Sequence, residues 1–272
     1  MAMGSTMNNP MINKLARLER KEERSGETVS SEKTASYGGI AFKTLIYLIF
    51  TAGGVALQFL VPVAEEHRNT VFLVAILLTG VTPFLAWLIK PLTAILGMVY
   101  SVCQGYVICW ASVMYAGEYQ GIVFAAVAIT LLIILVMLFL YTTRIVKVGH
   151  RFKAVVGTLF LTSMLGSLGV WVSGIIAPNN IIMQLLREEG SWVAIIGAAL
   201  SVLIAALFLL SDFETVERTV QDNLPKKYEW MAAFGLIITV LWLYLKVLNL
   251  IASIAAKGKS GSDSAAPTAP AQ

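Results

Sequence analysis

The sequence contains seven long apolar runs, and this repetition limits what the chain can fold into. An α-helix needs about 20 apolar residues to cross the hydrocarbon core of a bilayer, and each run has about that length. Strands of a membrane barrel would be about ten residues long and would alternate in polarity, which these runs do not. Over the chain 57% of residues are hydrophobic and 13% are charged, whereas a soluble domain has about 25% charged residues. We therefore expect an all-α integral membrane protein.

The apolar runs predict seven transmembrane helices, separated by charged turns and by proline, glycine and asparagine residues. The predicted helices cover residues 41–63, 70–89, 92–115, 121–141, 154–177, 192–210 and 230–255. They form a transmembrane domain over residues 40–256. A charged tail, residues 1–39, precedes this domain. A polar tail rich in proline and alanine, residues 257–272, follows it and is expected to be disordered.

The distribution of lysine and arginine predicts the orientation of the chain, because positively charged loops are retained in the cytoplasm. The N-terminal tail and the loops on its side carry most of the basic residues, including the loop from Arg144 to Lys153. The N-terminus is therefore expected in the cytoplasm, and seven crossings place the C-terminus outside. We expect a multi-pass protein of the inner membrane, surrounded by lipid and without a nucleic-acid partner.

Small residues spaced four apart favour close helix packing in lipid, because they let two backbones approach each other. Helix 92–115 carries such a face, made of Gly97, Ser101, Gly105 and Cys109. Helix 154–177 is also rich in small residues, namely Ser163, Gly166, Ser167, Gly169, Ser173 and Gly174. Packing is the favoured explanation for this second group, and the lining of a polar path is the alternative.

Signatures of enzymes are missing from the sequence. The two histidines, His67 and His150, lie in predicted loops, which argues against an HExxH zinc site or an intramembrane metal cluster. No nucleophile elbow of the form G-x-S-x-G and no phosphate-binding glycine loop occurs. We therefore expect no catalytic residues, no bound metal and no resident cofactor.

Ionisable residues at or within apolar helices are the candidate functional residues, because a charge in the hydrocarbon core persists mainly where it is paired or functional. Lys246 lies deep in the last predicted helix, and Asn249 is one turn away on the same face. Asp212 follows the apolar part of helix 192–210. These three residues are candidates for an ion pathway or a pH sensor. Alternatively, Asp212 is an interfacial charge and Lys246 snorkels to the membrane surface.

Five segments of the sequence resemble a known family of membrane proteins. SDFETVERTV (211–220) and EWMAAFGLIITVLWLYLKVLNL (229–250) are similar to the last two membrane helices of the Bax inhibitor-1 family, also called transmembrane Bax inhibitor motif proteins. NNPMINKL (8–15), EYQGIV (118–123) and TTRIVKV (142–148) resemble the bacterial branch of that family. The resemblance implies a seven-helix bundle with the last helix at its centre. It also implies a pH-sensitive calcium leak, with Ca²⁺ as the transported ion.

In that family two aspartates on the last two helices form the pH sensor, because two close carboxylates share a proton. Asp212 matches the first aspartate, whereas Lys246 occupies the position of the second and places a positive charge on the cation route. We expect a salt bridge between Asp212 and Lys246 that holds the pore closed. On straight helices the two positions differ in height by roughly 9 Å. The pair therefore requires a longer sixth helix or a break near Gly235, and otherwise Lys90 is an alternative partner of Asp212.

Three functions fit these patterns. The first is an ion leak that serves ion homeostasis. The second is a non-conducting scaffold that regulates a partner, such as a membrane protease, through the loop from Arg144 to Lys153. The third is a small-solute transporter, for which inverted repeats and broken helices would be expected, and Pro178 marks a break only outside the predicted helices. We predict the ion leak, with Asp212, Lys246 and Asn249 as site residues.

Overall fold

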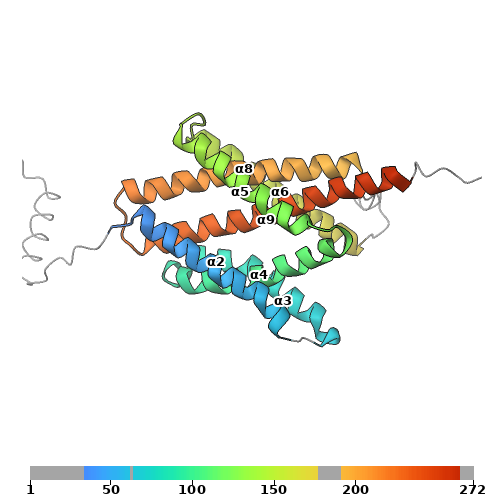
Figure 1. The fold of residues 1–272 in the computed structure, drawn as a ribbon. Coiled ribbons are helices and arrows are strands. Elements are labelled where there is room, and N and C mark those ends of the chain that lie inside the picture. Colours follow the sequence, from blue (N-terminus) through green and yellow to red (C-terminus); the bar gives the residue numbers. More distant parts are fainter. Residues whose placement is uncertain (1–33, 62–63, 177–190, 264–272) are drawn as a thin grey trace, which may run out of the picture. The chain divides into compact units, whose positions relative to one another are not determined.

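The computed structural model describes residues 34–61, 64–176 and 191–263. The chain divides into two units between Thr34 and Ala35, and all the described helices belong to the second unit. This part of the chain forms seven α-helices, so the all-helical class is confirmed. That all seven helices cross a membrane stays a prediction. The helices are α2 (Tyr37–Leu60), α3 (Glu65–Leu88), α4 (Thr93–Glu118), α5 (Ile122–Thr142), α6 (His150–Ile176), α8 (Trp192–Gln221) and α9 (Tyr228–Asp263) (Figure 1).

The outer surfaces of the helices suit a lipid environment. Six of the seven helices, all except α6, are long and apolar enough over their described residues to cross a membrane. Large apolar side chains point away from the bundle on these helices; for example, Phe124 is 80% exposed and Leu60 is 76% exposed. A soluble monomer rarely exposes a large contiguous apolar surface, whereas hydrocarbon chains of lipids solvate it. The chain is therefore a multi-pass membrane protein.

The largest difference from the predicted helix boundaries occurs at α8, which continues past Leu210 to Gln221. The added turns are polar, and an ion pair between Glu214 and Arg218, four residues apart, stabilises them. Asp212 consequently lies inside a helix rather than at its end. Residues 257–263, which the sequence placed in the C-terminal tail, continue α9. Residues 1–33 and 264–272 of the two predicted tails lie outside the described residues.

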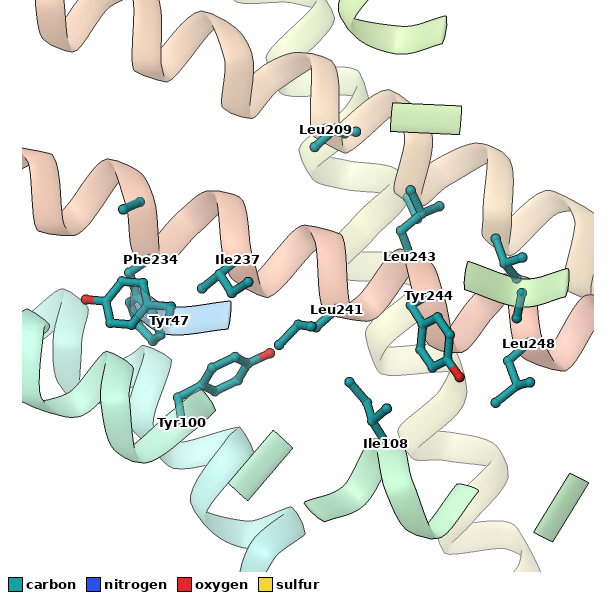
Figure 2. Close-up of a cluster of buried hydrophobic side chains, with 14 of the residues drawn as sticks. Tyr47, Tyr100, Ile108, Leu209, Phe234, Ile237, Leu241, Leu243, Tyr244 and Leu248 are labelled. Carbon is teal, nitrogen blue, oxygen red and sulfur yellow. The ribbon is translucent and has the colours of Figure 1, made fainter. Parts of the chain in front are cut away.

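Helix α9 packs against α2, α4, α5 and α8. It contributes buried side chains to both of its flanks, so it is the most enclosed of the six candidate spans. Figure 2 shows Tyr47, Tyr100 and Ile108 on one side of α9 and Leu209 of α8 on the other. Tyr47 and Leu209 are fully buried. Buried side chains of α2, α4 and α8 therefore pack against α9.

Glycine residues bring α2 and α4 into backbone contact. A Cβ atom added at Gly54 would lie 2.1 Å from the carbonyl oxygen of Val102, and one added at Gly105 would lie 2.1 Å from the carbonyl oxygen of Thr51. No side chain larger than hydrogen fits at either position without moving a helix. The predicted packing role of the small-residue face on residues 97–109 is therefore confirmed.

Candidate functional site

Asp212 lies on the side of α8 that faces α9. Its Oδ1 atom lies 3.9 Å from the position that a Cβ atom would take at Gly235. The Thr239 hydroxyl of α9, which donates a hydrogen bond of 3.3 Å to the Gly235 carbonyl oxygen, and the Lys153 ammonium of α6 both act on the carboxylate. The Oδ2 atom is buried and has no hydrogen-bond partner in the described part of the chain. The cation that acts on Asp212 is therefore Lys153 rather than Lys90, the alternative suggested by the sequence.

Lys246 forms no ion pair with Asp212, and both residues belong to the described part of the chain. The ammonium of Lys246 instead lies 5.5 Å from the centre of the Trp242 ring. Helix α9 runs without a break through Gly235. Lys246 is therefore about 10 Å farther along the axis of α9 than Thr239, the residue that meets Asp212. The predicted salt bridge is wrong, because the longer α8 does not remove this difference in height.

Two cavities adjoin at Lys246. The first has a volume of about 480 Å³ and lies between α3, α4, α6, α8 and α9. The second has a volume of about 420 Å³ and lies between α6, α8 and α9. Lys246 and Ser163 line both. The polar residues lining one or both cavities are Thr79, Tyr100, Gln104, Ser163, Ser201, Thr239, Lys246, Asn249 and Ser253. Four of these residues lie at helical spacing on α9, namely Thr239, Lys246, Asn249 and Ser253. Thr239 lies beside Asp212.

Asn249 belongs to the second cavity, together with Ser253. The Oδ1 atom of Asn249 accepts a hydrogen bond of 3.3 Å from the Tyr115 hydroxyl of α4. Ser253 donates a hydrogen bond of 2.9 Å to the Asn249 carbonyl oxygen. The structure therefore brings Lys246 and Asn249 to one cavity, whereas Asp212 lines neither and lies beside Thr239, which lines the first.

The small residues of α6 differ from the packing prediction. Ser163 and Gly166 line the cavities. A Cβ atom added at Gly166 or Gly169 would have no heavy atom within 4 Å, so neither glycine holds α6 against a neighbour. The alternative interpretation, a polar path, fits Ser163 and Gly166. The surroundings of Ser167 and Gly174 lie outside what the structure describes.

A buried ion pair that the sequence pattern did not reveal joins the start of α2 to the start of α9. Glu229 is fully buried and pairs with the Lys43 ammonium. The backbone N–H of Ser36 donates a hydrogen bond of 2.9 Å to Glu229 Oε1, and the Ser36 hydroxyl donates another of 3.3 Å. The Ala35 N–H also donates to the Leu224 carbonyl in the α8–α9 turn, at 2.8 Å. Charges near helix ends are ordinary, so no sequence pattern points to this pair.

Acidic residues near the end of α8 pair with basic residues that follow α5 and begin α6. Glu214 binds Lys153. Glu217 lies 3.6 Å from the Arg144 guanidinium and accepts a hydrogen bond from the Tyr141 hydroxyl. The loop from Arg144 to Lys153, which the scaffold alternative would use to bind a partner, therefore has intramolecular partners at both of these residues. Lys153 interacts with both Glu214 and Asp212. It therefore links this cluster of ion pairs to Asp212.

These features define a polytopic α-helical membrane protein with two adjoining cavities along its last helix. Within the described residues, no three His, Cys, Asp or Glu side chains are grouped so that they could hold a metal ion. The family model described as Bax inhibitor 1 like matches residues 9–256, and the chain belongs to this family. No curated protein and no solved structure matches the chain. The resemblance to the Bax inhibitor-1 family is confirmed, and its bacterial branch stays a prediction.

Proposed function

We propose that the protein is a pH-sensitive ion leak, with Ca²⁺ as the transported ion and ion homeostasis as its role. The observation that carries this proposal is the pair of adjoining cavities along α9, from Thr239 beside Asp212 to Ser253. Polar and charged side chains at membrane depth are costly and persist mainly on ion or substrate paths. Membership of the Bax inhibitor 1-like family supports the same function.

Asp212 is the proposed pH sensor. Its carboxylate meets Thr239 of α9 and interacts with Lys153 of α6. Protonation would remove the attraction between Asp212 and Lys153, and Lys153 would retain only its pairing with Glu214. A change of charge at such a contact can shift the balance between two packing arrangements of the helices. Lys246 and Asn249 line the path, and no residue is assigned a catalytic role.

The proposed topology has α6 as the seventh crossing and α9 at the centre of the bundle. The N-terminus lies in the cytoplasm of a bacterial cell and the C-terminus lies outside its inner membrane, as the basic residues predict. Reporter fusions test this topology. A reporter that is active only outside the cytoplasm should work at the C-terminus and fail in the loop at Gly149. Activity in neither fusion would contradict the seventh crossing.

Flux into liposomes tests the function. Purified protein in liposomes that contain a calcium indicator should admit Ca²⁺ at a rate that depends on pH. Asp212→Asn should remove the pH dependence, because the amide cannot change its charge. Asp222→Asn is the matched control, since Asp222 is exposed and follows α8. Flux equal to that of protein-free liposomes at every pH would contradict the leak and favour a scaffold that regulates a partner.

A further inference from the structure

Lys246 has no acidic counterpart among the described residues that line its cavities. Of the described residues that line the two cavities, none is Asp or Glu, and Lys246 supplies the single formal charge. The ammonium contacts the face of the Trp242 ring, which attracts a cation but does not neutralise it. Asp212 is about 10 Å distant along the helix axis. Among the described residues, the charge of Lys246 is therefore unbalanced.

The position of Lys246 argues against snorkelling to the membrane surface. Trp230 lies near one end of α9, and at the other end the Lys257 ammonium lies 4.2 Å from the centre of the exposed Trp192 ring. Lys246 is about 24 Å along the axis from Trp230 and about 16 Å from Lys257. Its ammonium lies over Trp242, one turn nearer to the start of α9. The side chain therefore extends away from the nearer end of the helix.

Several neutral hydrogen-bond donors share the cavities with Lys246. Gln104 and Ser163 line the first cavity, and Ser163 and Asn249 line the second. The amide of Asn249 still has its N–H groups to offer, because Oδ1 is the atom that accepts from Tyr115. One ammonium together with neutral donors is the arrangement that coordinates an anion of a single charge.

We infer that the cavities beside Lys246 bind a small monovalent anion, with the Lys246 ammonium as its charge partner and Ser163, which lines both cavities, as a neutral donor. Gln104 adds a donor in the first cavity and Asn249 adds one in the second. The inference shares the cavities with the proposed leak, yet binding does not require conduction, so the two can fail separately. A bound anion would cancel the positive charge that Lys246 places on a cation route. It would thereby reconcile Lys246 with cation passage.

Iodide quenching of tryptophan fluorescence tests the inference, because the Trp242 ring lies beside the Lys246 ammonium. The full chain is placed in nanodiscs of phosphatidylcholine, and sodium iodide replaces sodium gluconate at constant ionic strength. We expect a saturable part of the quenching that chloride competes away and that Trp242→Phe removes. Lys246→Met should weaken the apparent iodide affinity by about tenfold or more, since a charged donor is lost. Lys246→Arg should retain it.

Lys257→Met is the matched control, because Lys257 also lies over a tryptophan ring on α9 but at the end of the helix. It should leave the saturable part unchanged. Quenching that rises linearly with iodide, or that is the same in Lys246→Met, would overturn the inference. Loss of the saturable part in nanodiscs of phosphatidylglycerol would also overturn it, since the site would then hold a lipid headgroup. Saturable quenching without any flux in liposomes would contradict the leak alone.

Discussion

The carboxylate of Glu229 lies between the ammonium of Lys43 and the backbone amide of Ser36, out of contact with solvent and lipid. The pair fastens the first described helix to the last, because Lys43 belongs to α2 and Glu229 to α9. Both charged groups are compensated, and Ser36 satisfies a further lone pair of the carboxylate. Such a pair is costly to break from one side only, since the remaining charge stays buried.

Replacing Glu229 by glutamine should therefore destabilise the protein. We expect the free energy of unfolding to fall by about 3 kcal/mol or more, because Lys43 would be left without its counter-charge. The free energy is measured by titration with a denaturing detergent. Glu118→Gln is the control, since Glu118 is an exposed residue at the end of α4. Equal effects of Glu229→Gln and Glu118→Gln would contradict a stabilising role of the pair.

Gly39→Ala should disturb the same ion pair by steric overlap with the Glu229 carboxylate. A Cβ atom at this position would lie 2.2 Å from Glu229 Oε1, so the carboxylate or the start of α2 must move. We expect a loss of about 1–3 kcal/mol in the free energy of unfolding, as for other overpacked sites. Gly38→Ala is a close control, because a Cβ atom there would have no heavy atom within 4 Å. If both variants unfold alike, the contact between Gly39 and Glu229 does not matter.

Gly54→Ala should separate α2 from α4. The added methyl group would lie 2.1 Å from the backbone oxygen of Val102, which cannot rotate away as a side chain does. We expect a loss of about 1–3 kcal/mol or more. Gly53→Ala adds the same methyl group one residue earlier into open space, and alanine favours the helix. The thermal unfolding midpoint of Gly53→Ala should stay level or rise, and a fall equal to that of Gly54→Ala would refute the close approach.

Ser163→Leu should block the path where the two cavities meet, because Ser163 lines both. A bulky apolar side chain at a constriction excludes water and ions. We expect the flux into liposomes to fall by about tenfold. Thr158→Leu is the control, because Thr158 is an exposed residue of the same helix. Unchanged flux in Ser163→Leu would place the route elsewhere in the bundle.

The sequence by itself determined the class of protein, the approximate positions of the described helices and the family. These properties depend on local patterns: apolar runs of membrane length, turns rich in charges and glycine, and segments such as SDFETVERTV. The packing role of Gly105 was also predictable, because spacing by four residues defines a helix face before any partner is known. The end of α8 was not, since residues 211–221 are polar and become helical through contacts such as those of Glu214 with Arg218 and Lys153.

Only the tertiary structure decided which charges meet. Glu229 and Lys43 are 186 residues apart in the chain, and the meeting of two such charges depends on how the helices pack rather than on spacing within either one. The pairing of Asp212 with Lys246 looked plausible on a family pattern, but it failed because both residues are fixed on continuous helices at different heights. Thr239 and Lys153 act on Asp212 instead. The cavities at Lys246 likewise arise from the gaps left between five packed helices.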